Sequence, residues 1–92
     1  MKITEEYIDY KVEIIEIISA RYIGDYAIRI VFNDETNRLV DFRPFLESSL
    51  HPSIRKYLNE TMFKDFKIVN GNLNWNDYDM IFPVEDLYKG EL

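Results

Sequence analysis

Apolar and polar residues alternate most clearly in the stretch YAIRIVF, residues 26–32. One side of this period of two carries the larger apolar residues, which are Tyr26, Ile28, Ile30 and Phe32. Such alternation is typical of a β-strand with one buried face. The stretch RLVDF, residues 38–42, alternates in the same way, and the polar turn formers NDETN between the two stretches predict a hairpin.

The segment before this hairpin also favours a strand. Residues 12–20, VEIIEIISA, are rich in β-branched side chains, which suit a pleated sheet. A helix is the competing interpretation, because Glu13 and Glu16 are three residues apart. Gly24 and Asp25 then give a turn signal, so we expect a first strand that turns into the hairpin.

A helical pattern follows the hairpin. Pro44 is expected to end the last strand, since proline cannot donate to a sheet ladder. Ile54, Tyr57 and Leu58 lie at i, i+3 and i+4, which places them on one helical face. Pro52 suits a first helical position. We therefore predict one or two short helices over residues 45–59.

A second hairpin and a closing helical turn are predicted in the last third of the chain. Asn70-Gly71 is a strong type I′ turn signal between short strands at 66–69 and 72–75. Residues 80–82, MIF, are a candidate extension of the second strand. Residues 83–88 are expected to form a final helical turn with acidic residues near its start, where the helix dipole favours them.

These elements predict an α+β fold in the order β-β-β-α-β-β-α. We expect a small antiparallel sheet of about five strands, with short helices packed on one face. Apolar residues make up 47% of the 92-residue chain, which is enough for a packed core, and no linker or repeat divides it. The expectation is a single domain over residues 1–92. The free edges of such a sheet make a weak homodimer plausible.

Charge is unevenly distributed along the chain. The net charge is −6, and both ends are acidic while the middle is nearly balanced. A surface that binds the phosphates of a nucleic acid needs positive charge, so nucleic acid is not the expected partner. An acidic chain is better suited to a basic protein. The chain has no cysteine, no apolar run long enough for a membrane span and no secretory signal at its start, so we expect a cytoplasmic protein.

The sequence offers no catalytic set. His51 is the single histidine, and it precedes Pro52 at an expected helix start, where a capping or solvent-exposed role is the ordinary interpretation. Ser48, Ser49 and Ser53 lie near His51, but neighbours in sequence do not make a catalytic triad. A strained nucleophile turn and a phosphate-binding loop are both absent. We therefore expect no enzymatic activity and no cofactor or metal.

The most polar candidate surface lies in residues 71–88. Its acids, Asp77, Asp79, Glu85 and Asp86, have no nearby basic residue in the sequence except Lys89. They can form a solvated face, a cation site or a surface for a basic partner, and they lack the spacing of a calcium loop. We expect them to be dispensable for folding.

Trp75 lies on the same strand face as Leu73 and is expected to pack between the sheet and the helices. If its strand lies at the edge of the sheet, the ring would be partly exposed and would anchor an interface. The possible partner-binding surface comprises Trp75, Asp77, Tyr78, Asp79, Glu85, Asp86 and Tyr88.

The order of these motifs resembles a family of small bacterial proteins, domain of unknown function 2442. The resemblance begins in the stretch FNDETNRLVDFRPFL, residues 32–46, and its later positions are Leu58, Phe63, Phe66, Ile68, Asn70-Gly71, Leu73, Trp75, Pro83 and Leu87-Tyr88. It covers roughly residues 12–88. Family members often have glycine in the first hairpin turn and in the turn after the tryptophan, where this chain has Glu35 and Tyr78. Asp79 is about one position away from the family's usual aspartate.

The resemblance implies a small α+β domain with an antiparallel sheet and no established activity. Family members are often encoded beside a small basic protein, in arrangements that look like toxin–antitoxin pairs. We therefore expect a non-enzymatic protein-interaction module, antitoxin-like toward a small basic partner. The alternative is a regulatory or nucleic-acid-binding domain that would use Arg21, Arg29, Arg38, Arg43, Arg55 and Lys56. Three of these, Arg29, Arg38 and Arg43, are expected to share one sheet face.

Overall fold

The computed structural model describes residues 14–76, 78–90 and 92. Two three-stranded antiparallel sheets and several short helices make up this part of the chain. In order, the elements are β2 (Ile17–Gly24), β3 (Ala27–Phe32), β4 (Asn37–Asp41), α1 (Arg43–Ser48), α2 (Pro52–Arg55), the 3₁₀ helix η1 (Lys56–Leu58), α3 (Glu60–Phe63), β5 (Lys67–Val69), β6 (Asn72–Trp75), β7 (Met80–Ile81) and α4 (Val84–Lys89). The α+β class is confirmed, but the described strands number six and form two sheets instead of one.

The first sheet has the strand order β2-β3-β4. The predicted β3–β4 hairpin is confirmed, with Ile28 opposite Val40 and Ile30 opposite Arg38. The first strand begins at Ile17 and extends to Gly24, four residues beyond the predicted end at 20. It extends because its backbone continues to pair with β3 up to the Gly24–Ala27 pair.

The helical segment contains more turns than predicted. Helix α1 begins at Arg43 because Pro44 fits the first turn of a helix, where no N–H is needed. Helix α3 was not predicted, although its start carries a capping signal. The Asn59 side chain accepts hydrogen bonds from the backbone N–H groups of Thr61 and Met62, at 3.0 and 3.4 Å. None of the helices in the described part of the chain has the length and apolar character that a membrane crossing would require.

The second sheet has the order β5-β6-β7 and is joined to the first at its hairpin turn. Asn70 and Gly71 have φ angles of 53° and 78°, which confirms the predicted type I′ geometry. The Gly71 carbonyl accepts a hydrogen bond of 2.9 Å from the Ile17 N–H of β2. A Cβ atom at residue 71 would lie 2.8 Å from the Glu16 Cβ, so both the backbone angle and the close approach require glycine.

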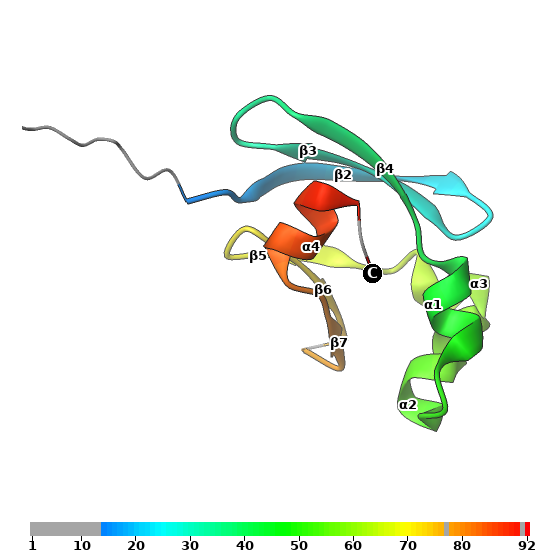
Figure 1. The fold of residues 1–92 in the computed structure, drawn as a ribbon. Helices are drawn as coiled ribbons and strands as arrows, with labels where there is room; N and C mark the ends of the chain where they lie inside the picture. The colour runs from blue at the N-terminus through cyan, green and yellow to red at the C-terminus, as the bar shows by residue number, and fades with distance from the viewer. Residues whose placement is uncertain (1–13, 77, 91) are drawn as a thin grey trace, which may run out of the picture.

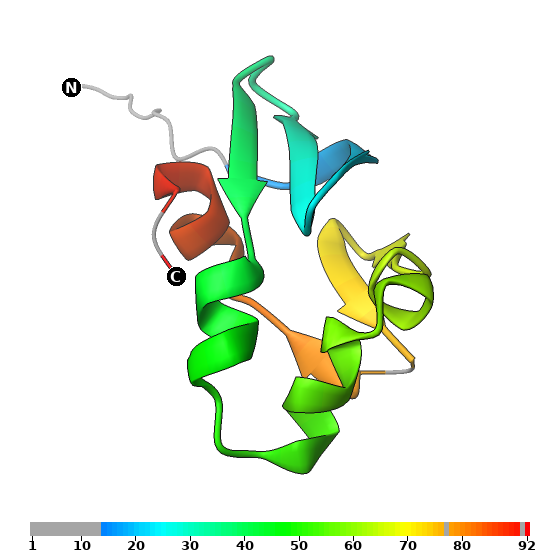
Figure 2. The ribbon, with the colours of Figure 1, turned by 90° about the vertical axis from the view of Figure 1, so that its right-hand side faces the viewer.

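A core rich in aromatic side chains joins the two sheets and the helices, whose arrangement is shown in Figures 1 and 2. Trp75 lies at its centre and is fully buried. Its ring packs against Phe42, Phe63 and Phe82, with centroid separations of 5.6 to 5.9 Å. The indole N–H donates a hydrogen bond of 2.6 Å to the Phe63 carbonyl, so β6 and the end of α3 are fixed to one another. Trp75 is thus a core residue, in agreement with the first of the two interpretations above.

Candidate functional site

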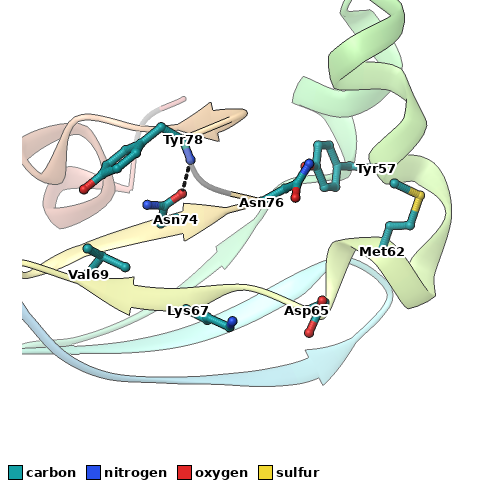
Figure 3. A pocket seen from close by; sticks show the side chains of 8 residues that line it. All are labelled: Tyr57, Met62, Asp65, Lys67, Val69, Asn74, Asn76 and Tyr78. Atoms are coloured by element: carbon teal, nitrogen blue, oxygen red, sulfur yellow. Dashed lines mark hydrogen bonds between the residues drawn. The ribbon is translucent and has the colours of Figure 1, made fainter.

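A recess of about 680 Å³ lies beside β5 and β6, between the helical segment and the turn that joins β6 to β7 (Figure 3). Its lining residues come from η1, α3, the α3–β5 connection, β5, β6 and the β6–β7 turn, and they are Tyr57, Met62, Asp65, Lys67, Val69, Asn74, Asn76 and Tyr78. Met62 and Tyr78 stand at opposite ends of it (Figure 3). Both are exposed, Met62 by 38% and Tyr78 by 53%. Large apolar side chains that remain exposed around a concave surface are typical of binding sites.

Asn74 holds the turn at one end of the recess. It is a buried polar residue on the central strand β6. Its Oδ1 accepts a hydrogen bond of 2.6 Å from the Tyr78 N–H, and the Asp79 N–H donates to the Trp75 carbonyl at 2.9 Å. The backbone of Tyr78 is left-handed, with a φ of 71°, which is uncommon for a bulky residue. The hydrogen bonds of the turn hold the Tyr78 backbone in this conformation despite its strain.

A polar network closes the other side of this turn. The hydroxyl of the buried Tyr57 donates a hydrogen bond of 2.9 Å to Asp79 Oδ2. Lys56 Nζ lies 2.5 Å from the same oxygen. Hydrogen bonds from Lys56 and then Tyr57 lower the pKa of Asp79. Burial, followed by the hydrogen bond to Asp79, raises the pKa of Tyr57 to about 12. Asp79 is therefore a structural anion that ties the turn to η1.

This pairing corrects the expectation that the acids of residues 71–88 have no basic neighbour except Lys89. The error arose because Lys56 is 23 positions away from Asp79 in the sequence, and only the folded chain brings η1 beside the turn. Glu85 and Asp86 fit the expectation better, since they lie in the first turn of α4 and form no ion pair within the described residues. Asp77 lies outside the described residues.

Tyr88 lies away from the recess and is engaged within the fold. Its hydroxyl donates a hydrogen bond of 2.6 Å to Asp34 Oδ2, and this bond is the main cause of the lowered pKa of Asp34. The Tyr88 ring packs edge-on against Phe32, and the Tyr88 carbonyl accepts a hydrogen bond of 2.6 Å from Arg38 Nε. Tyr88 thus fastens α4 to the β3–β4 hairpin. The candidate surface therefore does not assemble as one patch, since Tyr78 is its one described residue that lines the recess.

The basic residues of the middle of the chain are also separated. Arg38 pairs with Ile30, so its side chain lies on the sheet face that also carries Val40. Arg29 pairs with Leu39, so its side chain lies on the opposite face. Arg43 begins α1 and pairs with Asp25 at 2.6 Å. The expectation that Arg29, Arg38 and Arg43 share a face was wrong, because alternate residues of a strand point to opposite faces and the register places 29 and 38 out of phase.

Most of the lining of the recess was missed by the sequence analysis. The pattern did place Asn72 and Asn74 on the face opposite Leu73 and Trp75. It gave no sign that Tyr57 and Met62 would stand beside that face, because α2, η1 and α3 are too short to define a direction by periodicity. In the described residues, no group of three histidine, aspartate or glutamate side chains is placed to hold a metal ion.

The sequence profile of a family described as "Protein of unknown function (DUF2442)" matches residues 17–92. The chain belongs to the DUF2442 family. The match covers both sheets and every described helix. Comparison with curated proteins and with solved structures gave no match.

Two turn residues have backbone angles that are uncommon for residues other than glycine. Glu35 and Tyr78 have φ angles of 73° and 71°. They occupy the two turn positions at which the resemblance implies glycine, the residue that adopts positive φ without steric cost. At Tyr78 this turn puts an exposed aromatic ring at the edge of the recess.

Proposed function

We propose that the chain is a non-enzymatic protein-binding module whose recess receives a basic side chain of a partner protein. The observation that carries the proposal is the recess itself, with an exposed aromatic ring at one end and an exposed thioether at the other. Tyrosine and methionine are enriched at protein interfaces, where they cover an anchor side chain and exclude water.

The polar groups of the recess suit an arginine or lysine. Asp65 is exposed and makes no ion pair within the described part of the chain. Its carboxylate can accept hydrogen bonds from a guanidinium or ammonium group. Met62 and Val69 supply apolar surface for the aliphatic stem of such a side chain. Lys67 also lines the recess and would oppose a second cation, so the head group is expected to lie on the Asp65 side.

Overall charge supports a basic partner mainly through attraction at a distance. The whole chain has a net charge of −6. The described residues hold nine of the 11 basic residues and 11 of the 17 acidic ones, which gives −2. Such a field raises association rates with a cationic protein and weakens with added salt. An antitoxin-like role toward a small basic protein is the specific form of this proposal, and the family resemblance supports it.

The alternative of a nucleic-acid-binding domain has less support. It would use six basic residues, and four of these are engaged inside the fold. Arg38 donates to the Tyr88 carbonyl, and Arg43 pairs with Asp25. Arg55 donates to backbone carbonyls of the α1 region, and Lys56 pairs with Asp79. Two arginines remain, which is few for binding that depends on neutralising many phosphates.

The proposal is tested by purifying the tagged chain from its native host at low salt and identifying any small basic protein that is retained with it. Asp65→Asn is expected to weaken capture, Tyr78→Ala to weaken it further, and Lys67→Gln to strengthen it. Glu85→Gln is the matched control, because it removes the same charge as Asp65→Asn at an exposed site outside the recess. If Asp65→Asn and Glu85→Gln reduce capture equally, the recess is not the binding site. If no basic protein is retained at low salt, the proposed function fails.

A further inference from the structure

The first sheet has an outer face on the side away from the core. We define this outer face by Ile18, Arg21, Ile23, Arg29, Leu39 and Asp41, and Asp41 is the one acidic residue among these. The register places Arg21 opposite Arg29, and Arg29 opposite Leu39, so the three side chains form one row across the sheet. The described helices and the second sheet lie on the other side of this sheet (Figures 1 and 2).

Exposed apolar side chains flank the arginine row. Ile18 is 60% exposed and Ile23 is 50% exposed. Both residues lie at β-bulges of β2, where the register of pairing with β3 shifts by one residue. Leu39, on the far strand of the sheet, is 55% exposed. Three large apolar side chains on one sheet face are unusual for a surface that meets only water.

The two arginines are poorly placed for the isolated chain. Side chains directly opposite one another on a sheet have Cβ atoms about 5 Å apart, and like charges in that position repel. Neither Arg21 nor Arg29 makes an ion pair or a side-chain hydrogen bond with another described residue, in contrast to Arg38, Arg43 and Arg55. The outer face thus presents two neighbouring arginines, whose donors no other described residue occupies, beside apolar surface.

We propose that the outer face binds an extended, acidic segment of a partner protein. Carboxylates of the segment pair with Arg21 and Arg29, whose planar forks suit bidentate hydrogen bonding. Apolar side chains of the same segment cover Ile23 and Leu39. This surface shares no residue with the recess, and its partner has the opposite charge to the one proposed there. The chain would then hold a basic and an acidic partner on separate surfaces.

Charge and symmetry favour this occupant over two others. A second copy docked face to face about a two-fold axis would bring Arg21 and Arg29 against the same arginines. A nucleic acid would gain only two phosphate contacts and would lie against exposed isoleucine and leucine, which its phosphates cannot cover. An acidic protein segment satisfies the arginines and covers the apolar side chains together.

The experiment measures binding of a fluorescein-labelled decapeptide, in which glutamate alternates with valine, to the full-length chain by fluorescence anisotropy. Binding is expected to saturate, to weaken with salt and to weaken at least tenfold, about 1.4 kcal/mol, in Arg21→Gln/Arg29→Gln. Leu39→Ser is expected to weaken it severalfold. The control is Lys64→Gln/Lys89→Gln, which removes the same two charges from exposed sites elsewhere. Circular dichroism verifies that each variant is folded.

Five results would overturn the proposal, and the last of them concerns a control peptide. The first is absence of saturable binding by the acidic peptide. The second is an equal loss of affinity in the arginine and lysine variants, which would indicate net charge alone. The third is tighter, arginine-dependent binding of a single-stranded oligonucleotide. The fourth is a dimer, seen by light scattering, that dissociates on Leu39→Ser and shows the face to be a self-interface. A decapeptide with lysine in place of glutamate must bind at least tenfold more weakly than the acidic one.

Discussion

The indole N–H of Trp75 provides a sharp test of how the core supports the recess. It is fully buried and donates a hydrogen bond of 2.6 Å to the carbonyl of Phe63, the last residue of α3. Trp75→Phe keeps an aromatic ring but leaves that carbonyl without its donor. A buried polar group that loses its partner costs about 1–3 kcal/mol. The void left by the smaller ring, a few tens of Å³ at ~24 cal/mol/Å³, adds about 1 kcal/mol.

We therefore expect Trp75→Phe to lower the free energy of unfolding by about 2–4 kcal/mol. This is a large fraction of the 5–15 kcal/mol that is usual for native proteins. Urea unfolding followed by far-ultraviolet circular dichroism measures the change without relying on tryptophan fluorescence. Because α3 carries Met62 at the recess, the same variant is expected to bind a basic partner more weakly even when it is folded.

Phe82→Leu is the matched control for volume. Phe82 is buried beside Trp75 and packs edge-on against it, but its side chain makes no hydrogen bond. Its substitution is expected to cost about 1–1.5 kcal/mol, as for a modest loss of core volume. If Trp75→Phe costs no more than Phe82→Leu, the bond to the Phe63 carbonyl does not stabilise the fold and the reasoning is refuted.

Three further predictions concern the turns and the network at η1. Glu35→Gly is expected to raise the melting temperature by relieving the positive φ of 73°, whereas Glu35→Ala, which keeps the strain, is not; equal effects would contradict this. Asp79→Asn is expected to destabilise the chain at pH 7, whereas neutralising Glu85 and Asp86 is not. Because the pKa of Asp79 is lowered in the folded chain, its contribution to the free energy of unfolding is present above the unfolded pKa and is lost as the pH falls through the folded pKa. Below the folded pKa, urea unfolding is expected to give the same stability for Asp79→Asn and for the wild type. The folded pKa of Tyr57 is raised to about 12, so its contribution to the free energy of unfolding is complete below the unfolded pKa of about 10 and is lost as the pH rises to about 12. If stability falls with alkaline pH in the same way in Tyr57→Phe, this prediction is contradicted.

Local patterns in the sequence were sufficient for most of the elements. The alternation of apolar and polar residues identified β3 and β4, and Asn70-Gly71 identified the second hairpin and its turn type. These features depend on a few neighbouring residues, because strand faces repeat every second residue and type I′ turns need positive φ at both central positions. Pro83–Tyr88 likewise gave the closing helix, which the structure places at Val84–Lys89.

The division into two sheets was decided by the tertiary structure. The sequence shows which segments are strands, but pairing between distant strands depends on how the helices of residues 43–63 turn the chain. The four helical elements there have three to six residues each, and so none is long enough for its direction to be predicted from periodicity. The contact of β2 with the Gly71 turn follows from that path.

The candidate binding surfaces depend on the tertiary structure even more. The sequence alone determined that both ends are acidic and that Trp75 shares a face with Leu73. Only the folded chain brought Lys56 and Tyr57 to Asp79, placed Met62 across a recess from Tyr78, and set Arg21 opposite Arg29. Charges and rings that are 8 to 23 positions apart interact through space, and their distances are fixed by strand register and helix packing rather than by their order along the chain.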